Sequence, residues 1–261
     1  DDTTWGGEFA PLYLESVYVP EGLNLYVDVD KTPELKLVMV EGSLIFAPHT
    51  DPNHERYFDA NYIFLNQGYM EVGTEEHPYT SKLTITMHGN ISSPYLPIFG
   101  NKCIAVKEST LDMHGIKREP TWTVMNETSL PGATEIKLTG RVDWVAGEEI
   151  AIAPTGFNPR EGEKRIIAAI DKSNPDIPVV TLDAPLDYKH FAMIQYYGDD
   201  FIDMRAEVGL LTRNVKYRGD PETSAPNQYG ATIFLHSEGD DSLIARLEYV
   251  ELTDVGQAFK I

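Results

Sequence analysis

The sequence predicts an all-β fold in which successive coils stack as a parallel β-solenoid. Short segments rich in Val, Ile, Leu, Tyr and Phe recur along the chain, and each is bounded by Gly, Pro, Asn or Asp. No segment shows the apolar spacing of a convincing amphipathic helix. Similar steps also recur at a spacing of 26 residues (67 − 41), as expected when each coil lays a strand and a turn on the previous coil.

The expected strands are short and follow one another along the whole chain. In order they cover residues 35–40, 43–47, 61–66, 82–87, 103–106, 135–138, 148–153, 179–182, 210–217, 231–236 and 247–252. The segment at 161–170 has the best helical pattern, but it fits a charged turn that enters a strand equally well. A β-sandwich is the structural alternative, because its strands also come at intervals of about 8–12 residues.

Two pairs of segments share the 26-residue spacing. EGSLIF at 41–46 is followed by QGYMEV at 67–72, and TMHG at 86–89 is followed by DMHG at 112–115. Equivalent positions of successive coils face the same side of a solenoid. The prediction therefore stacks three apolar side chains inside the fold: Leu44, Met70 and Leu111.

The composition excludes two classes of partner. The 261 residues carry 21 Lys and Arg against 41 Asp and Glu, which gives a formal net charge of −20. Such a field repels phosphate backbones and anionic lipid headgroups, so we expect neither a nucleic-acid nor a membrane-surface role. No run of about 18 apolar residues is present to span a bilayer, and the N-terminus lacks the pattern of a signal peptide. If the protein is exported, we expect its signal outside this chain.

Cysteine and asparagine residues give information about the cellular compartment of the protein. Cys103 is the only cysteine, which excludes an intramolecular disulfide and a multi-cysteine zinc site. Its apolar surroundings predict a buried side chain. Two N-glycosylation sequons, at Asn90 and Asn126, are candidate modification sites of a secreted or surface protein.

The stretch RAEVGLLTRNVKYRG, residues 205–219, is a candidate binding site because it is basic in an acidic chain. Its candidate ligand-binding residues are Arg205, Arg213, Lys216 and Arg218. In one interpretation these side chains face water or pair with carboxylates of neighbouring coils, as charges on a sheet usually do. In the other they form a shallow basic strip that holds an acidic sugar. The first interpretation is favoured.

Metal sites have weaker support in the sequence. His88 and His114 precede glycines in the two MHG turns, and stacking could bring their imidazoles together at a metal. Histidines that bond to the backbone of a turn are the favoured interpretation. The segment DVDK at 28–31 lacks the third acid and the Gly of an EF-hand loop, which leaves only loose calcium binding at this acidic edge. No other cofactor is expected.

Asp and Glu residues are plentiful, so two carboxylates that cleave a glycoside together remain an alternative at this point. Asp203 and Glu207 flank Arg205, where a salt-bridged surface cluster is the favoured interpretation. The segment VDWVAGEE at 142–149 indicates a turn between strands, with Trp144 as its anchor.

Several motifs together resemble the G8-domain family, whose members include fibrocystin and fibrocystin-L. These motifs are TWGGE near the N-terminus, GTEEHPY at 73–79, MHG at 87–89 and 113–115, and RAEVGLLTRN at 205–214. The family also includes cell-migration-inducing hyaluronan-binding proteins and transmembrane protein 2. The resemblance implies a G8 domain over 1–125, followed over 126–261 by connector strands and the start of a right-handed parallel β-helix.

The resemblance also bears on the branch of the family. Only a short connector stands between TWT and VDW, where the hyaluronan-binding branch carries an inserted globular domain, so the fibrocystin-like branch is favoured. In relatives a histidine-rich motif follows soon after VGQ at 255–257, whereas this chain stops at Ile261. We therefore expect further chain, and further coils, C-terminal to Ile261.

Two functions from different classes follow. The favoured one is a non-catalytic β-solenoid module at the cell or ciliary surface, in the ectodomain of a membrane-anchored or secreted glycoprotein. It would serve adhesion, assembly or ligand recognition, with other extracellular proteins and glycans as partners and no nucleic acid. The alternative is a polysaccharide-binding or polysaccharide-depolymerising, hyaluronidase-like enzyme domain. No nucleophile or metal motif supports catalysis, so the sequence leans away from an enzyme.

Overall fold

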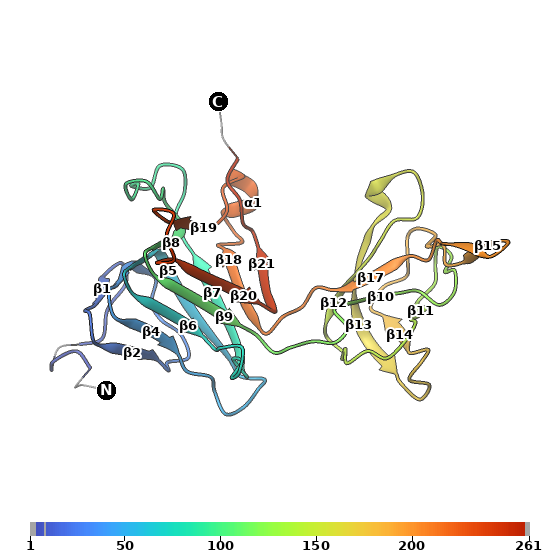
Figure 1. The fold of residues 1–261 in the computed structure, drawn as a ribbon, viewed down its shortest axis with the longest axis horizontal. Helices are drawn as coiled ribbons and strands as arrows, with labels where there is room; N and C mark the ends of the chain where they lie inside the picture. The colour runs from blue at the N-terminus through green and yellow to red at the C-terminus, as the bar shows by residue number, and fades with distance from the viewer. Residues whose placement is uncertain (1–3, 8, 259–261) are drawn as a thin grey trace. The chain divides into compact units, whose positions relative to one another are not determined.

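Two sheets of parallel strands build the first of two structural units (Figure 1). The computed structural model describes residues 4–7 and 9–258. The parallel unit consists of Asp1–Lys117 together with Arg213–Ile261, and the second unit consists of Arg118–Thr212.

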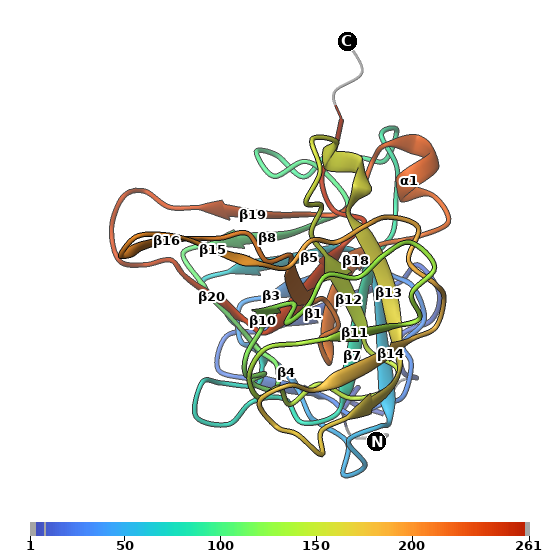
Figure 2. The same cartoon turned by 90° about the vertical axis from the view of Figure 1, so that its right-hand side faces the viewer.

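The larger sheet of the parallel unit has the strand order β1-β3-β5-β7-β18-β21, with β8 beside β5 and β19 beside β8. Strand β5 pairs with β7 through its first half and with β8 through its second half. Figure 2 shows β19 beside β8, in agreement with their parallel register. The strands are β1 (Ser16–Val19), β3 (Leu35–Val40), β5 (Glu55–Asn66), β7 (Lys82–Met87), β8 (Cys103–Lys107), β18 (Val215–Gly219), β19 (Thr232–His236) and β21 (Val250–Thr253).

The smaller sheet has the order β2-β4-β6-β9-β20, and its described pairs are also parallel. Its strands are β2 (Asn24–Val27), β4 (Ser43–Phe46), β6 (Tyr69–Val72), β9 (Thr110–His114) and β20 (Ile244–Glu248). After the first coil, each strand pairs with one from the preceding coil, and β7–β8 and β18–β19 are consecutive strands within the larger sheet. This is a β-helix-like arrangement. The predicted all-β class and the parallel sheets are confirmed.

The interior of the parallel unit is a column of aligned apolar side chains. Leu44 lies opposite Met70 in the register of β4 and β6, and Met70 lies opposite Leu111 in the register of β6 and β9. All three residues are buried, with no more than 1% of their surface exposed. The predicted stacking is confirmed. The 26-residue spacing between EGSLIF and QGYMEV is the length of the coil from β4 to β6, whereas the next coil, from Met70 to Leu111, takes 41 residues (111 − 70).

The second 26-residue repeat has a different origin. TMHG begins in β7 of the larger sheet, whereas DMHG begins in β9 of the smaller sheet. His88 and His114 therefore do not occupy equivalent positions of successive coils, and the expected equivalence of the two turns is wrong. A similarity of four residues carries no information about which sheet a strand joins.

The second unit, Arg118–Thr212, is antiparallel in all its described strand pairs. Its six-stranded sheet has the order β10-β17-β12-β13-β14-β11, and an antiparallel bridge between Met125 and Leu138 links the chain beside the two edge strands. Trp144 is fully buried and donates from Nε1 to the Pro120 carbonyl at 2.8 Å, so it anchors its turn as predicted. The strands are β10 (Trp122–Val124), β11 (Glu135–Lys137), β12 (Glu149–Ile152), β13 (Glu163–Asp171), β14 (Val179–Leu182) and β17 (Glu207–Leu210), and a separate hairpin consists of β15 (Ile194–Tyr197) and β16 (Asp200–Asp203).

This antiparallel unit differs from the expected connector strands and β-helix start over 126–261. The chain leaves the parallel unit after β9 and returns at β18, which pairs directly with β7. The expected strand at 210–217 is accordingly divided between β17 in one unit and β18 in the other. Strands of both units share the same composition, and only their pairing partners, which are distant in sequence, separate them.

Helical structure in the described residues is limited to η1 (Pro159–Glu161) and α1 (Ser224–Asn227). The segment at 161–170 enters strand β13 directly after η1, as the charged-turn interpretation predicted. No helix in this part of the chain is long and apolar enough to cross a membrane.

A second apolar cluster lies beneath the loop that joins β7 to β8. Phe99 of this loop packs against Phe64 of β5 and Phe234 of β19, with ring centroids 5.3 and 5.5 Å apart. Cys103 belongs to the same cluster, and burial raises the pKa of its thiol to about 12. The expected buried cysteine is confirmed.

Met70→Ala should destabilise the parallel unit by about 2–5 kcal/mol, because it leaves a cavity between Leu44 and Leu111 in a column that cannot close around it. Urea unfolding followed by circular dichroism measures the change. Leu130→Ala is the control, since Leu130 is 61% exposed. Equal effects of the two substitutions would contradict a stacked core at Met70.

Candidate functional site on the outward face of strand β18

Strand β18 presents two of the four basic candidate residues outward from the larger sheet. The residues that alternate with Lys216 and Arg218 are buried, so these two side chains face outward, where they are half-buried. Arg213 precedes the strand in the same unit, whereas Arg205 belongs to the antiparallel unit. The structure brings Lys216 and Arg218 together and assigns Arg205 elsewhere.

The parallel register gives each of these two cations fixed neighbours. Lys216 lies opposite Thr84 of β7 and Glu251 of β21, and its Nζ is 3.0 Å from the Glu251 carboxylate. Arg218 lies opposite Thr86 of β7, and its Nε donates to Thr86 Oγ1 at 3.2 Å. Lys216 thus forms the ion pair between coils that the structural interpretation expected.

Arg218 differs from the other basic candidates in its partner. Arg205 forms an ion pair with Asp203 at 2.7 Å, and the backbone N–H of Arg213 donates to Glu251 at 3.2 Å. Within residues 4–7 and 9–258, Arg218 forms no ion pair with a carboxylate, and a hydroxyl holds its guanidinium. Arg218 is therefore a half-buried positive charge that an external anion can neutralise.

Hydroxyl groups and an aromatic ring border Arg218 on the same face. Tyr57 of β5 lies opposite Thr84, and both hydroxyls donate to Glu55, at 2.9 and 2.8 Å. Donation to Glu55 raises the pKa of the Tyr57 hydroxyl, while the charge of Arg218 acts in the opposite direction, so the two side chains are within electrostatic reach. A guanidinium, hydroxyls and an exposed ring are groups that recognise a carboxylated sugar.

Both candidate metal-binding histidines lie beside carboxylates, and of the two, His88 is hydrogen-bonded to one. His88 Nε2 is 2.7 Å from Asp59; burial lowers the pKa of His88, but this hydrogen bond and nearby acids outweigh burial, and the net shift is upward. His114 is buried, 3.6 Å from Asp112 and 3.7 Å from Glu248. In the described residues no three His, Cys, Asp or Glu side chains are arranged to hold a metal ion.

Other acidic candidates also have partners. Asp203 pairs with Arg205, which accounts for one of the two acids in the salt-bridged surface cluster that the sequence favoured. At the acidic edge at 28–31, Asp30 contacts His54 Nε2 at 2.8 Å. Calcium binding there stays a prediction.

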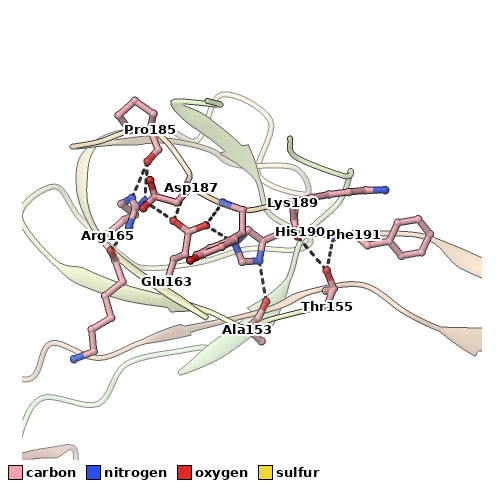
Figure 3. A network of polar contacts seen from close by, with 11 residues as sticks. Ala153, Thr155, Glu163, Arg165, Pro185, Asp187, Lys189, His190 and Phe191 are labelled. Carbon is pink, nitrogen blue, oxygen red and sulfur yellow. Dashed lines mark hydrogen bonds and ion pairs between the residues drawn. The ribbon is translucent and has the colours of Figure 1, made fainter. Parts of the chain in front are cut away.

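A buried ionic network in the antiparallel unit was not predicted from the sequence (Figure 3). The ring of His190 lies between the Ala153 carbonyl, 2.8 Å from Nδ1, and Glu163, 2.9 Å from Nε2. Glu163 also accepts two backbone N–H groups, each at 2.9 Å, and pairs with Arg165. Glu163 and His190 are 27 residues apart and share no motif, so only the folded chain brings them together.

The geometry of this network indicates a structural role. The two ring nitrogens of His190 contact the Ala153 carbonyl on one side and the Glu163 carboxylate on the other. Burial raises the pKa of Glu163, but its hydrogen bonds and Arg165 outweigh burial and hold the pKa below its usual value. His190 is fully buried, so we interpret the network as a clamp between β13 and the segment that contains His190.

Comparison with known proteins identifies the family. Residues 4–126 match the G8 domain family. The chain belongs to the G8-domain family. It is 32% identical over its whole length to fibrocystin-L of Mus musculus, and 30% identical over 99% of its length to fibrocystin-L of Homo sapiens. It is also 25% identical over 98% of its length to fibrocystin of Canis lupus familiaris.

The G8 match confirms the resemblance to fibrocystin-like proteins and gives the domain a boundary. The match ends at residue 126, just after β10, whereas the parallel unit gives way to the antiparallel unit after Lys117. The chain spans about 7% of the length of each of these three fibrocystin relatives.

Glu163→Gln should destabilise the antiparallel unit by about 3–5 kcal/mol at neutral pH, because it removes the buried carboxylate that pairs with Arg165 and contacts His190. The folded pKa of Glu163 is lowered, so its contribution is complete above the unfolded value of 4.5 and is lost as pH falls through the folded value. The variant should lack this part of the acid dependence. Hydrogen exchange of peptides from β12 to β14, at neutral and acidic pH, measures both effects.

Asp187→Asn is the matched control, because Asp187 pairs with the same Arg165 but its side chain is 75% exposed. We expect a cost below about 1 kcal/mol for this surface pair. Similar protection losses in the two variants would show that burial of Glu163 is not what matters.

Proposed function

We propose that the chain is a non-catalytic extracellular module of a fibrocystin-like surface protein, and that its parallel unit is a right-handed β-helix. Similarity to fibrocystin-L over the whole chain supports an extracellular, receptor-type module. The right-handed sense follows the strong preference of connections between parallel strands. The proposed roles are adhesion, assembly or ligand recognition, in an ectodomain that is membrane-anchored or secreted.

We propose the outward face of β18 as the ligand site and an acidic glycan as its ligand. The observation that carries this proposal is the half-buried guanidinium of Arg218, which in the part of the chain that the structure describes is held by Thr86 and not by a carboxylate. A carboxylate of the glycan would form charge-assisted hydrogen bonds with the Arg218 guanidinium. The exposed ring of Tyr57 offers a surface for the sugar ring beside it.

Recognition is favoured over glycoside cleavage because the acids that border the site are engaged. Glu55 accepts from Tyr57 and Thr84, and Glu251 pairs with Lys216. Cleavage needs two carboxyl groups that face the scissile bond, one to donate a proton and one to act as base or nucleophile. These contacts support a binding module better than a depolymerising enzyme.

The last coil supports the proposal that further coils follow C-terminal to Ile261. In the described residues β19, β20 and β21 each pair with a strand of the preceding coil only. Three side chains on these strands stay partly exposed although their partners in the preceding coil, Val106, Met113 and Tyr217, are buried: Leu235 45%, Leu247 36% and Leu252 48%. Exposed apolar strand edges of this kind tend to pair with further strands, and additional coils of the same chain would supply these strands.

Asn126 should carry a glycan when the chain is secreted from eukaryotic cells, because its side chain is exposed and its sequon is intact. Mass spectrometry before and after N-glycosidase treatment measures occupancy, and Asn126→Gln should remove the added mass. Asn90, whose Oδ1 accepts the Ser92 N–H at 2.8 Å, is the second proposed site. Unmodified Asn126 in secreted material would contradict the proposal.

Arg218→Gln should weaken binding of a uronic-acid oligosaccharide at least about ten-fold, because it removes a charge-assisted contact worth about 1.5–3 kcal/mol. Isothermal titration calorimetry with this oligosaccharide, and with a neutral oligosaccharide of equal length, measures the effect. Arg160→Gln is the control for net charge, since Arg160 is exposed on η1 in the antiparallel unit. An Arg218 variant that folds and binds as tightly as the parent chain would exclude this site.

A further inference from the structure

One hairpin of the antiparallel unit has an exposed edge strand. Among the described strands, β15 pairs only with β16, and the two form a separate two-stranded sheet. No residue of either strand is buried. Two-stranded sheets are marginally stable alone and gain stability from an additional strand or a packed face.

Large apolar side chains are concentrated on this hairpin. Tyr196 is 69% exposed and Phe201 is 63% exposed, and their rings meet across the two strands at 6.2 Å. Tyr197 and Ile202 are exposed as well. Adjacent exposed apolar side chains on a soluble domain indicate an interaction surface.

The two strands of the hairpin differ in charge. Strand β15 reads Ile-Gln-Tyr-Tyr, without a charged residue or a proline, whereas β16 begins with Asp200 and ends with Asp203. Charged side chains protect a strand edge from pairing with another chain. The edge of β15 lacks this protection.

The register shows which backbone groups of β15 point away from β16. The Met204 N–H donates to the Met193 carbonyl at 3.0 Å, immediately beside the hairpin strands. Hydrogen-bonded and non-hydrogen-bonded pairs alternate along antiparallel strands. Ile194 and Tyr196, opposite Asp203 and Phe201, are therefore non-hydrogen-bonded positions whose N–H and C=O groups point outward.

We propose that β15 pairs antiparallel with β15 of a second copy of this chain, about a two-fold axis at Gln195. Ile194 of each copy then lies opposite Tyr196 of the other, and the outward groups form about four hydrogen bonds. The two outward positions lie symmetrically about Gln195, so the segment complements itself, as a two-fold interface requires. The acids of β16 lie on the outer strands of the resulting four-stranded sheet, away from the new contact.

Sedimentation velocity of the 261-residue chain at rising concentration should show a weak monomer–dimer equilibrium, because the contact is small. Added salt should strengthen it, since each copy carries a formal charge of −20 and salt screens their repulsion. Tyr196→Pro removes an outward N–H and a ring but no hydrogen bond of the hairpin. It should lower the association constant at least about ten-fold.

Phe201→Pro is the matched control, because Phe201 lies directly opposite Tyr196 and its N–H points to the outer edge of β16. It should leave most of the association intact. Hydrogen exchange of the β15–β16 peptide verifies that the hairpin persists in each variant. If a proline variant unfolds the hairpin, Tyr196→Lys, which places a charge on the edge, takes its place. Equal association in the parent chain and the Tyr196 variants overturns the proposal. The proposal is also overturned if the chain stays monomeric and an added oligosaccharide protects Tyr196 from hydrogen exchange.

Discussion

In-register parallel pairing between coils is the constraint on which the parallel unit depends. Each strand repeats the inward and outward pattern of the strand before it, so Leu44, Met70 and Leu111 align as one apolar column. The turns help to fix this register because successive coils approach each other closely there. A Cβ at Gly42 would collide with the Leu23 carbonyl, and a Cβ at Gly68, one coil later, would collide with the Val40 carbonyl. Because side chains alternate with a period of two, a slip of one residue would exchange the core and the surface of a whole strand.

The same constraint arranges the outward face of the larger sheet. Parallel stacking brings residues at equal positions within contact distance, so like charges in successive coils would repel. Lys216 avoids this through Glu251 of the next coil, while Arg218 lies between the uncharged Thr86 and Thr253. Arg218 thus has no carboxylate partner among the described residues, in a strand whose inward side chains are buried, and this combination makes it a binding candidate.

The antiparallel unit links the two edge strands of its six-stranded sheet to each other. The bridge of Met125 with Leu138 lies beside β10 and β11 and links the two edges of its six-stranded sheet. The clamp of Glu163 with His190 then holds the segment that leads to the β15–β16 hairpin, beside the apolar core of this unit. A rigid base of this kind presents the exposed strand β15 in a defined conformation, which favours its pairing over its fraying.

The sequence by itself determined the all-β class, the length of one coil and the residues that line the core at Leu44, Met70 and Leu111. It also indicated the buried Cys103 and the anchoring Trp144, because local composition carries these two features. The family followed from the resemblance of several motifs to known members. Only the tertiary structure decided which strands pair. It separated Arg205 from Lys216 and Arg218, placed the two MHG turns at different sheets, and joined Glu163 to His190 across 27 residues. The physical reason is that a period of two tells which side chains of a strand face inward, whereas the partner of that strand is chosen by contacts between segments that are distant in the chain.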